Sequence, residues 1–141
     1  MMKVNPYLIF DGNAEEAFNF YRSVFGGEFS SVNRMSEAPG MENLPEDQKN
    51  RLMHISLPIA EHITLMASDC GPGMNEGFKI GNNVNISVHP GSREEADRLF
   101  NGLSAGGKIE MPIGDMFWGD YFGSFVDKFG VNWMVNYSKN F

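Results

Sequence analysis

Two segments of the chain carry apolar residues at the spacing of an amphipathic helix. Residues 13–29 and 92–109 each open with a residue that favours a helix start, Asn13 or Ser92, and continue with Glu-Glu-Ala. Both segments include a glycine pair near their end, where a helix can stop with a positive φ angle. The segments lie about 80 residues apart, which indicates a duplicated module rather than a short solenoid repeat.

Segments with the alternating pattern of β-strands surround each predicted helix. The predicted strands cover residues 4–10, 27–35, 51–59, 62–68, 83–89, 107–114, 118–127 and 131–137. The order βαβββ therefore occurs twice, and residues 36–50 are expected to form an exposed loop. We predict an α+β fold in which two βαβββ modules form a curved, mostly antiparallel eight-stranded sheet around a cleft. The modules, at about 1–70 and 83–141 with a connection at 71–82, are expected to form a single domain, residues 1–141.

Alternation assigns the residues of each strand to two faces of the predicted sheet. The apolar face, expected to pack against the helices, includes Met53, Ile55, Leu57, Ile63, Leu65, Ala67, Val84, Ile86, Val88, Val131, Trp133, Val135 and Tyr137. The second face includes His54, Ser56, Thr64, Met66, Ser68, Asn85, Ser87, His89, Asn132, Met134 and Asn136, with no charged residue. Such a neutral polar face with methionines indicates a partly buried small-molecule pocket. A water-filled cleft or a subunit interface without a ligand would produce the same pattern.

An aromatic segment near the end of the chain adds a second feature of a pocket. Residues 115–137 hold both tryptophans of the protein. Four aromatic residues, Phe117, Trp118, Tyr121 and Phe122, are expected to lie near the polar face. Their rings could stack on a planar or cyclic ligand, so we interpret them as the aromatic wall of the cleft.

Composition excludes several classes of partner. The net charge is −7 and Lys and Arg are scattered, whereas nucleic-acid and anionic-membrane binding both need concentrated positive charge. No apolar run approaches the roughly 20 residues that span a bilayer, and the N-terminus lacks a signal-peptide pattern, so we expect a cytoplasmic protein. Cys70 is the only cysteine, which excludes an intrachain disulfide and a Cys-based zinc site. The adjacent Asp69 carboxylate is expected to raise the pKa of the Cys70 thiol and make it unreactive.

Four stretches of the sequence resemble a known family. NPYLIFDGNAEEAFNFYRSVFGGE, MHISL, LMASD and DMFWGDYFGSFVDKFGVNW look like the PhnB-like branch of the vicinal oxygen chelate superfamily, also labelled demethylubiquinone methyltransferase-like. The superfamily includes glyoxalase I, bleomycin-resistance proteins, fosfomycin-resistance enzymes and extradiol dioxygenases. The resemblance covers nearly the whole chain and implies the glyoxalase/bleomycin resistance fold and a homodimer. It implies no single function, because the superfamily spans several chemistries.

The resemblance also implies where a metal would bind. Metal-dependent members hold one divalent ion with His and Glu ligands on four strands, and the corresponding positions here fall at or near Pro6, Met66, Asn85 and Met134. None of these residues is a usual ligand for such an ion, so we expect no metal and no other cofactor. His54 is the best candidate for a ligand-facing imidazole, although a histidine with structural hydrogen bonds is the alternative.

Other catalytic patterns are missing from the sequence. It has no Gly-x-Ser-x-Gly, P-loop or dinucleotide-binding pattern, so binding of S-adenosylmethionine or nicotinamide lacks support. Asp115 and Asp120 flank the Phe-Trp pair, and turn formation beside glycine is the simpler interpretation of both. Asp120 is the better candidate for ligand binding, because it lies in the most family-specific segment.

Three functional hypotheses follow, and whether any reaction is catalysed stays open. We favour a metal-free small-molecule-binding protein whose ligand the sequence does not name. The alternatives are a glyoxalase- or dioxygenase-like metalloenzyme with unorthodox ligands around His54, and a dimeric interaction module without a ligand.

Overall fold

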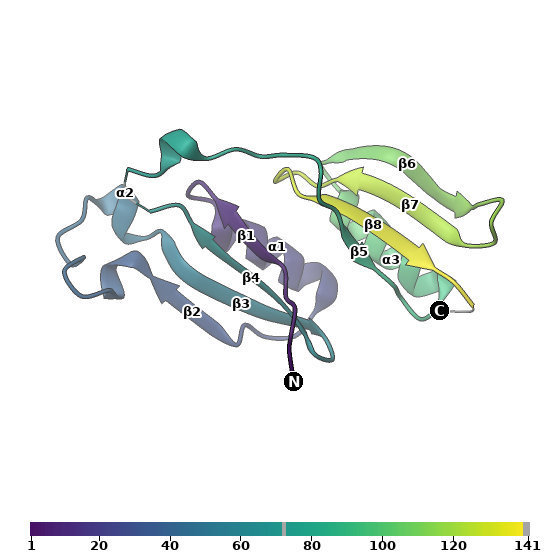
Figure 1. Ribbon diagram of the computed structural model, residues 1–141, viewed down its shortest axis with the longest axis horizontal. Coiled ribbons are helices and arrows are strands. Elements are labelled where there is room, and N and C mark those ends of the chain that lie inside the picture. Colours follow the sequence, from purple (N-terminus) through teal and green to yellow (C-terminus); the bar gives the residue numbers. More distant parts are fainter. Residues whose placement is uncertain (72, 140–141) are drawn as a thin grey trace. The chain divides into compact units, whose positions relative to one another are not determined.

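The computed structural model describes residues 1–71 and 73–139, and the chain divides into two compact units. We call residues 1–79 module 1 and residues 80–141 module 2. Pro72, in the predicted connection, and residues 140–141 lie outside the described residues. Each module contains the order βαβββ, which confirms the predicted α+β class and the duplication (Figure 1). That the modules make one domain around a cleft stays a prediction.

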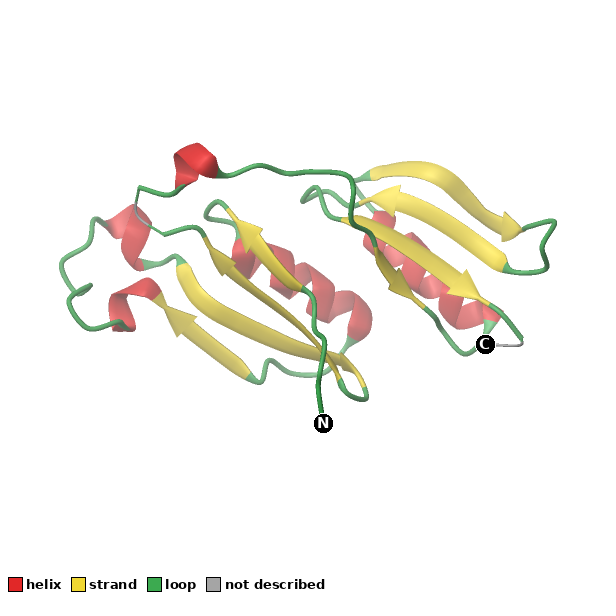
Figure 2. Cartoon of the chain, in the orientation of Figure 1, coloured by secondary structure: helices red, strands yellow, loops and turns green. Residues whose placement is uncertain are grey.

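Module 1 contains a four-stranded sheet with the order β1-β4-β3-β2. Strand β1 is parallel to β4, and the other two pairs are antiparallel. Helix α1 covers one face of this sheet (Figures 1 and 2). The short helix α2 lies in the segment predicted as an exposed loop, and η2 lies in the predicted connection. The short helix η1 begins at the buried Met35, the last residue of the predicted second strand, and continues into the predicted loop. The elements are β1 (Tyr7–Phe10), α1 (Ala14–Phe25), β2 (Ser31–Arg34), η1 (Met35–Glu37), α2 (Glu46–Lys49), β3 (Leu52–Ala60), β4 (Ile63–Asp69) and η2 (Asn75–Gly77).

The core of module 1 lies between α1 and its sheet. Phe18 and Tyr21 are fully buried on the helix, and Ile55, Leu57 and Leu65 are fully buried on the strands. The helical spacing of the first pair and the alternate spacing of the strand residues bring all five into one layer. Burial of each such side chain contributes about 1.5–3 kcal/mol.

Strand β3 departs from the predicted alternation at Met53. The prediction that Met53 packs against the helix is wrong, because its side chain is 39% exposed and Leu52 is fully buried instead. The pairing with β2 explains the change: Asn33 faces His54, but the next residue, Arg34, faces Leu52. Met53 is therefore the extra residue of a β-bulge, which turns its side chain away from the core.

Module 2 repeats the plan with the sheet order β5-β8-β7-β6, in which β5 is parallel to β8. Helix α3 covers one face of this sheet (Figures 1 and 2). The eight strands of the described residues are thus hydrogen-bonded as two four-stranded sheets. The elements of module 2 are β5 (Ile86–Val88), α3 (Arg93–Ser104), β6 (Lys108–Asp115), β7 (Tyr121–Val126) and β8 (Asn132–Tyr137).

The core of module 2 packs closely between α3 and the central strands. Phe100 of α3 meets Phe125 of β7 edge to face, with 5.2 Å between the ring centroids, and Trp133 is fully buried as predicted. Gly123 makes room for this contact, because a Cβ there would lie only 2.6 Å from the Phe100 ring. Val84, predicted for the apolar face, is 72% exposed because β5 begins only at Ile86.

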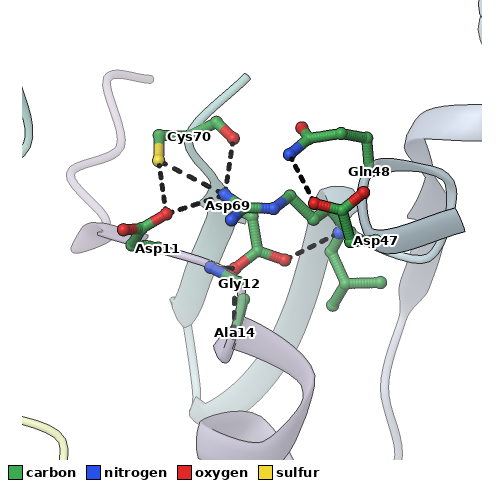
Figure 3. A network of polar contacts seen from close by, with 9 residues as sticks. Asp11, Gly12, Ala14, Asp47, Gln48, Asp69 and Cys70 are labelled. Carbon is green, nitrogen blue, oxygen red and sulfur yellow. Dashed lines mark hydrogen bonds and ion pairs between the residues drawn. The ribbon is translucent and has the colours of Figure 1, made fainter. Parts of the chain in front are cut away.

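The two long helices begin in different ways. Ser92 caps α3 as predicted, since its Oγ accepts a hydrogen bond from the Glu95 N–H at 3.1 Å. Asn13 makes no side-chain cap to α1, so its predicted capping role is wrong. The buried Asp69 at the end of β4 replaces it: Oδ1 accepts from the N–H groups of Gly12 and Ala14 at 2.8 and 3.0 Å (Figure 3).

Asp69 also joins α1 to the sheet. Its Oδ2 accepts from the Leu52 N–H at 2.8 Å, so one carboxylate links the start of α1, the end of β4 and the start of β3 (Figure 3). In module 2 a buried carboxylate at another position, Asp127, binds backbone N–H groups of the turn between β7 and β8 and accepts from the Trp133 ring N–H at 2.8 Å. In the described part of the chain, no helix is long and apolar enough to cross a membrane.

Candidate functional site

The predicted polar face of module 2 exists as the face of its sheet opposite α3. Cross-strand pairing places Ser87, Met134, Ser124 and Met111 side by side across the four strands. The neighbouring row contains Asn136 of β8 and Phe122 of β7, and the row on the other side contains Asn132, Val126 and Lys108. We call this surface the open face of module 2. Lys108, a charged residue, lies on this face at the edge strand β6.

Trp118 extends this face at the turn between β6 and β7. Its ring meets the Phe122 ring with 6.2 Å between centroids at a steep angle, and it is 51% exposed. Phe117 meets Trp118 edge to face at 5.0 Å but is 97% exposed. Trp118 and Phe122 therefore form an aromatic pair at one end of the open face, and Phe117 lies outside it.

Tyr121 does not belong to the predicted aromatic wall. It pairs with Tyr137 and Asp115, so alternation places it on the sheet face that packs against α3. Its hydroxyl donates a hydrogen bond to the Asp97 carboxylate of α3, and the Arg93 guanidinium lies 3.9 Å from its ring centroid. The hydrogen bond to Asp97, with burial, raises the pKa of Tyr121. Tyr121 thus ties β7 to the helix.

Asp120 lies beside the aromatic pair and meets one residue of the open face. The Asn136 Nδ2 donates to Asp120 Oδ2 at 3.1 Å. This bond fixes the orientation of the Asn136 amide and leaves its Oδ1 buried without a hydrogen-bond partner among the described residues. A buried acceptor without a partner costs about 1–3 kcal/mol, so this end of the face is polar and incomplete.

Three other predicted site residues differ in exposure and in their hydrogen bonds within the protein. They are Asn132, Asn85 and Ser87. Asn132 is buried, and its Nδ2 donates to the Gly81 carbonyl at 3.1 Å, which gives it a structural role within module 2. Asn85 is exposed and precedes β5. Ser87 Oγ lies 3.1 Å from His89 Nε2, so the two side chains form a hydrogen-bonded pair.

The open face of module 1, opposite α1, contains the other two predicted residues. His54 and Met66 lie on it with Tyr7, which pairs with Met66 across the strands. The Tyr7 hydroxyl lies 3.1 Å from His54 Nδ1, and their rings are 5.7 Å apart. His54 therefore has the structural hydrogen bond that the sequence left as an alternative to ligand binding.

Cys70 lies in a cluster with Asp11 and Arg51 (Figure 3). Its Sγ donates to Asp11 Oδ1 at 3.3 Å, and Arg51 Nη1 donates to the same oxygen at 2.9 Å. Burial, with the Asp11 carboxylate next, raises the pKa of the thiol. The direction agrees with the prediction, but the neighbouring Asp69 is not the cause, because its oxygens bind backbone N–H groups.

The residues at the four expected metal positions do not fit a divalent cation. Met66 and Met134 would offer thioethers, Asn85 an amide, and Pro6 no side-chain donor. Among the described residues, no three His, Cys, Asp or Glu side chains gather closely enough to hold an ion. That the protein holds no metal stays a prediction.

The sequence missed two residues of the open face of module 2. Met111 and Ser124 share a row with Met134, although neither was predicted for the site. The alternation of Phe122, Ser124 and Val126 in the seventh predicted strand would have located Ser124. Met111 could not be placed in this way, because β6 contains two register shifts.

A comparison with protein families decides the relationship of this chain. The model of a family described as 3-demethylubiquinone-9 3-methyltransferase matches residues 2–136. The chain belongs to this family. Protein YjdN from Escherichia coli strain K12 is 32% identical, over 98% of this chain and 97% of that protein.

Solved structures confirm the fold of this family member. Protein PA1353 from Pseudomonas aeruginosa is similar at a TM-score of 0.82 and 38% identity, over 98% of both chains. A putative 3-demethylubiquinone-9 3-methyltransferase, PhnB protein, from Bacillus cereus is similar at 0.78 and 30% identity, over 97% of this chain and 100% of that one. Glyoxalase- and bleomycin resistance-related structures at 10–17% identity, with TM-scores of 0.56–0.64, show the shared fold alone. The predicted PhnB-like resemblance and superfamily fold are therefore confirmed.

Proposed function

We propose that this family member binds a small organic molecule on the open face of module 2 and does so without a catalytic metal. The observation that carries the proposal is the Trp118–Phe122 pair beside a row of uncharged side chains, Ser87, Met134 and Ser124. Aromatic rings offer apolar contact area, and a few polar groups fix the orientation of a ligand. The methyl transfer in the family name is not part of the proposal, since the sequence has no fingerprint for S-adenosylmethionine.

A thermal-shift screen with aromatic metabolites and antibiotics tests this proposal. A ligand that binds only the folded protein raises its melting temperature, and a concentration of 100 times Kd adds about 2.7 kcal/mol of stability. We expect hits whose shift is lost in Trp118→Ala and kept in Phe29→Ala. Phe29 is a matched control, because it is an aromatic residue of module 1 that lies beneath Arg22. A library without hits, or hits whose thermal shift is the same in Trp118→Ala, would contradict the proposal.

Metal removal separates this function from the metalloenzyme alternative. We expect dialysis against a chelator to leave the melting temperature and the binding of any hit unchanged. Elemental analysis of protein purified without a histidine tag checks the same point. A stoichiometric metal whose removal abolishes ligand binding would favour the alternative with unorthodox ligands around His54.

A further inference from the structure

The Asp120 end of the open face has an electrostatic property that the proposed function does not specify. Asp120 is half-buried, and in the described part of the chain it accepts one side-chain hydrogen bond, from Asn136, and makes no ion pair. Partly buried carboxylates are usually paired or fully hydrogen-bonded, because loss of water is unfavourable for the charged form. Asp120 is thus an incompletely satisfied negative group beside an aromatic pair.

No basic residue of module 2 forms an ion pair with Asp120 in the described part of the chain. Lys139 comes two residues after Tyr137, the strand partner of Tyr121, and its side chain is exposed. Arg93 lies on the helix side of the sheet, where it binds Asp115 through Nη1 at 2.6 Å. Lys108 shares a row with Val126, which is four residues along β7 from Phe122. At about 3.3 Å per strand residue, that distance is roughly 13 Å.

The aromatic pair favours a positively charged ligand as well. The bond from Asn136 Nδ2 fixes the position of the Asp120 carboxylate at this end of the face. The faces of Trp118 and Phe122 carry the negative side of the ring quadrupole, which attracts cations. A carboxylate and two rings at one end of the face therefore both favour a positively charged N–H donor.

We infer that the ligand of this site is an aromatic organic cation whose ammonium or amidinium nitrogen lies at Asp120, with its ring against Trp118 and Phe122. This inference rests on the proposed function and adds the chemical class of the ligand. In this arrangement Asn136 is a positioning residue, because its Nδ2 donates to Asp120 Oδ2 and holds the carboxylate in place.

Three probes of matched shape test the inference: 2-phenylethylammonium, 2-phenylethanol and 3-phenylpropionate. Their Kd values are measured by NMR titration of the intact protein at low salt. We expect the ammonium probe to bind about tenfold more tightly than the alcohol, which is the effect of one charge-assisted hydrogen bond, and the carboxylate probe to bind most weakly. Equal affinity for the three probes in the unmodified protein overturns the inference, and this outcome depends on no variant.

Two variants locate the preference. Asp120→Asn keeps the size of the side chain and should reduce the ratio between ammonium and alcohol probes to about twofold or less. Asp115→Asn, at the other side of the same turn, removes a carboxylate that already binds Arg93 and should leave the ratio unchanged. A ratio that survives Asp120→Asn places the cation elsewhere and overturns the inference.

The outcome also distinguishes the inference from the proposed function. Binding of all three probes that depends on Trp118 but not on charge supports the proposed function and rejects the cation. If none of the probes binds and the broader library also gives no hits, both fail.

Discussion

The two modules share the order βαβββ but differ in how their open faces satisfy polar groups. On the face of module 1, Tyr7 and His54 bind each other, and Ser56 Oγ lies 2.7 Å from the hydroxyls of both Ser30 and Ser31. On the face of module 2, Asn136 Oδ1 has no partner in the described part of the chain. The two copies of the duplicated face thus satisfy their polar groups differently, and that of module 2 leaves a buried acceptor without a partner among the described residues.

The modules differ equally in how they anchor their helices. A carboxylate 55 residues away in the sequence, Asp69, binds Ala14 at the start of α1, whereas the local Ser92 caps α3. The Asp69 carboxylate joins three segments of the fold, whereas the Ser92 cap stabilises only the first turn of α3. The difference teaches that a repeated order of elements does not require repeated polar contacts, and four experiments can break or sharpen this conclusion.

The largest effect is expected from Asp69→Ala. It leaves three backbone N–H groups without their acceptor, which we expect to lower the free energy of unfolding by about 3–5 kcal/mol. Urea denaturation measures this value. Asp127→Ala in module 2 also leaves three donors without their acceptor, two backbone N–H groups and the Trp133 ring N–H, so we expect a loss of similar size. A loss of about 1 kcal/mol or less for Asp69→Ala would contradict its role in joining α1 to the sheet.

A smaller effect separates the two predicted caps. Ser92→Ala should cost about 1 kcal/mol, the usual value for the loss of an N-cap. Asn13→Ala should change stability by roughly 0.5 kcal/mol or less, since surface substitutions outside such contacts usually stay within that range. The pair is compared in the same urea series. Equal losses at the two sites would show that the helix starts do not differ as described.

The Tyr7–His54 contact provides a still smaller test on the face of module 1. Tyr7→Phe keeps the ring and removes the hydroxyl, so we expect a loss of about 0.5–1 kcal/mol, typical of a neutral hydrogen bond. Ligand binding should be unaffected, because the proposed site lies in module 2. Any substitution here that abolishes the binding of a Trp118-dependent ligand would show that both open faces contribute to the site.

The last test changes reactivity rather than stability. Because the folded pKa of the Cys70 thiol is raised, its thiolate fraction at pH 8 should fall below that of a free cysteine. Labelling by iodoacetamide should therefore be slow at pH 8 and accelerate as pH rises above the ordinary thiol value of about 9. The stability contributed by the neutral thiol is present below that pH and is lost as pH rises through the folded pKa. Asp11→Asn should speed labelling, whereas fast labelling of the unmodified protein at pH 8 would contradict the described cluster.

Local periodicity explains which parts of the fold the sequence predicted. Both long helices, the eight strands and the burial of Trp133 follow from spacing along one segment, and the structure confirms them. The position of Met53 did not follow, because a β-bulge depends on the partner strand. The link from Asp69 to α1 was equally invisible, since it joins residues far apart in the chain.

The candidate site was predicted in part from the alternation of residues along single strands. Met134 was predicted to lie on the sheet face opposite to that of Trp133. Its cross-strand pairing with Ser124 and Ser87 agrees with this prediction. Tyr121 and Phe122 are neighbours in a strand, so their side chains point to opposite faces of the sheet and cannot both belong to one aromatic wall. The contact between Asn136 and Asp120 could not be predicted from the sequence, because it forms only when β7 and β8 pair and bring Asp120 beside β8.

The most direct test of ligand binding in module 2 uses the two tryptophans. Trp118 is half-exposed and Trp133 is fully buried, so acrylamide should quench the fluorescence of Trp118 almost alone. Titration with a hit from the screen should protect Trp118 from quenching in a saturable manner, with the Kd obtained from thermal shifts. A hit that stabilises the protein but leaves the quenching of Trp118 unchanged would contradict the proposed site.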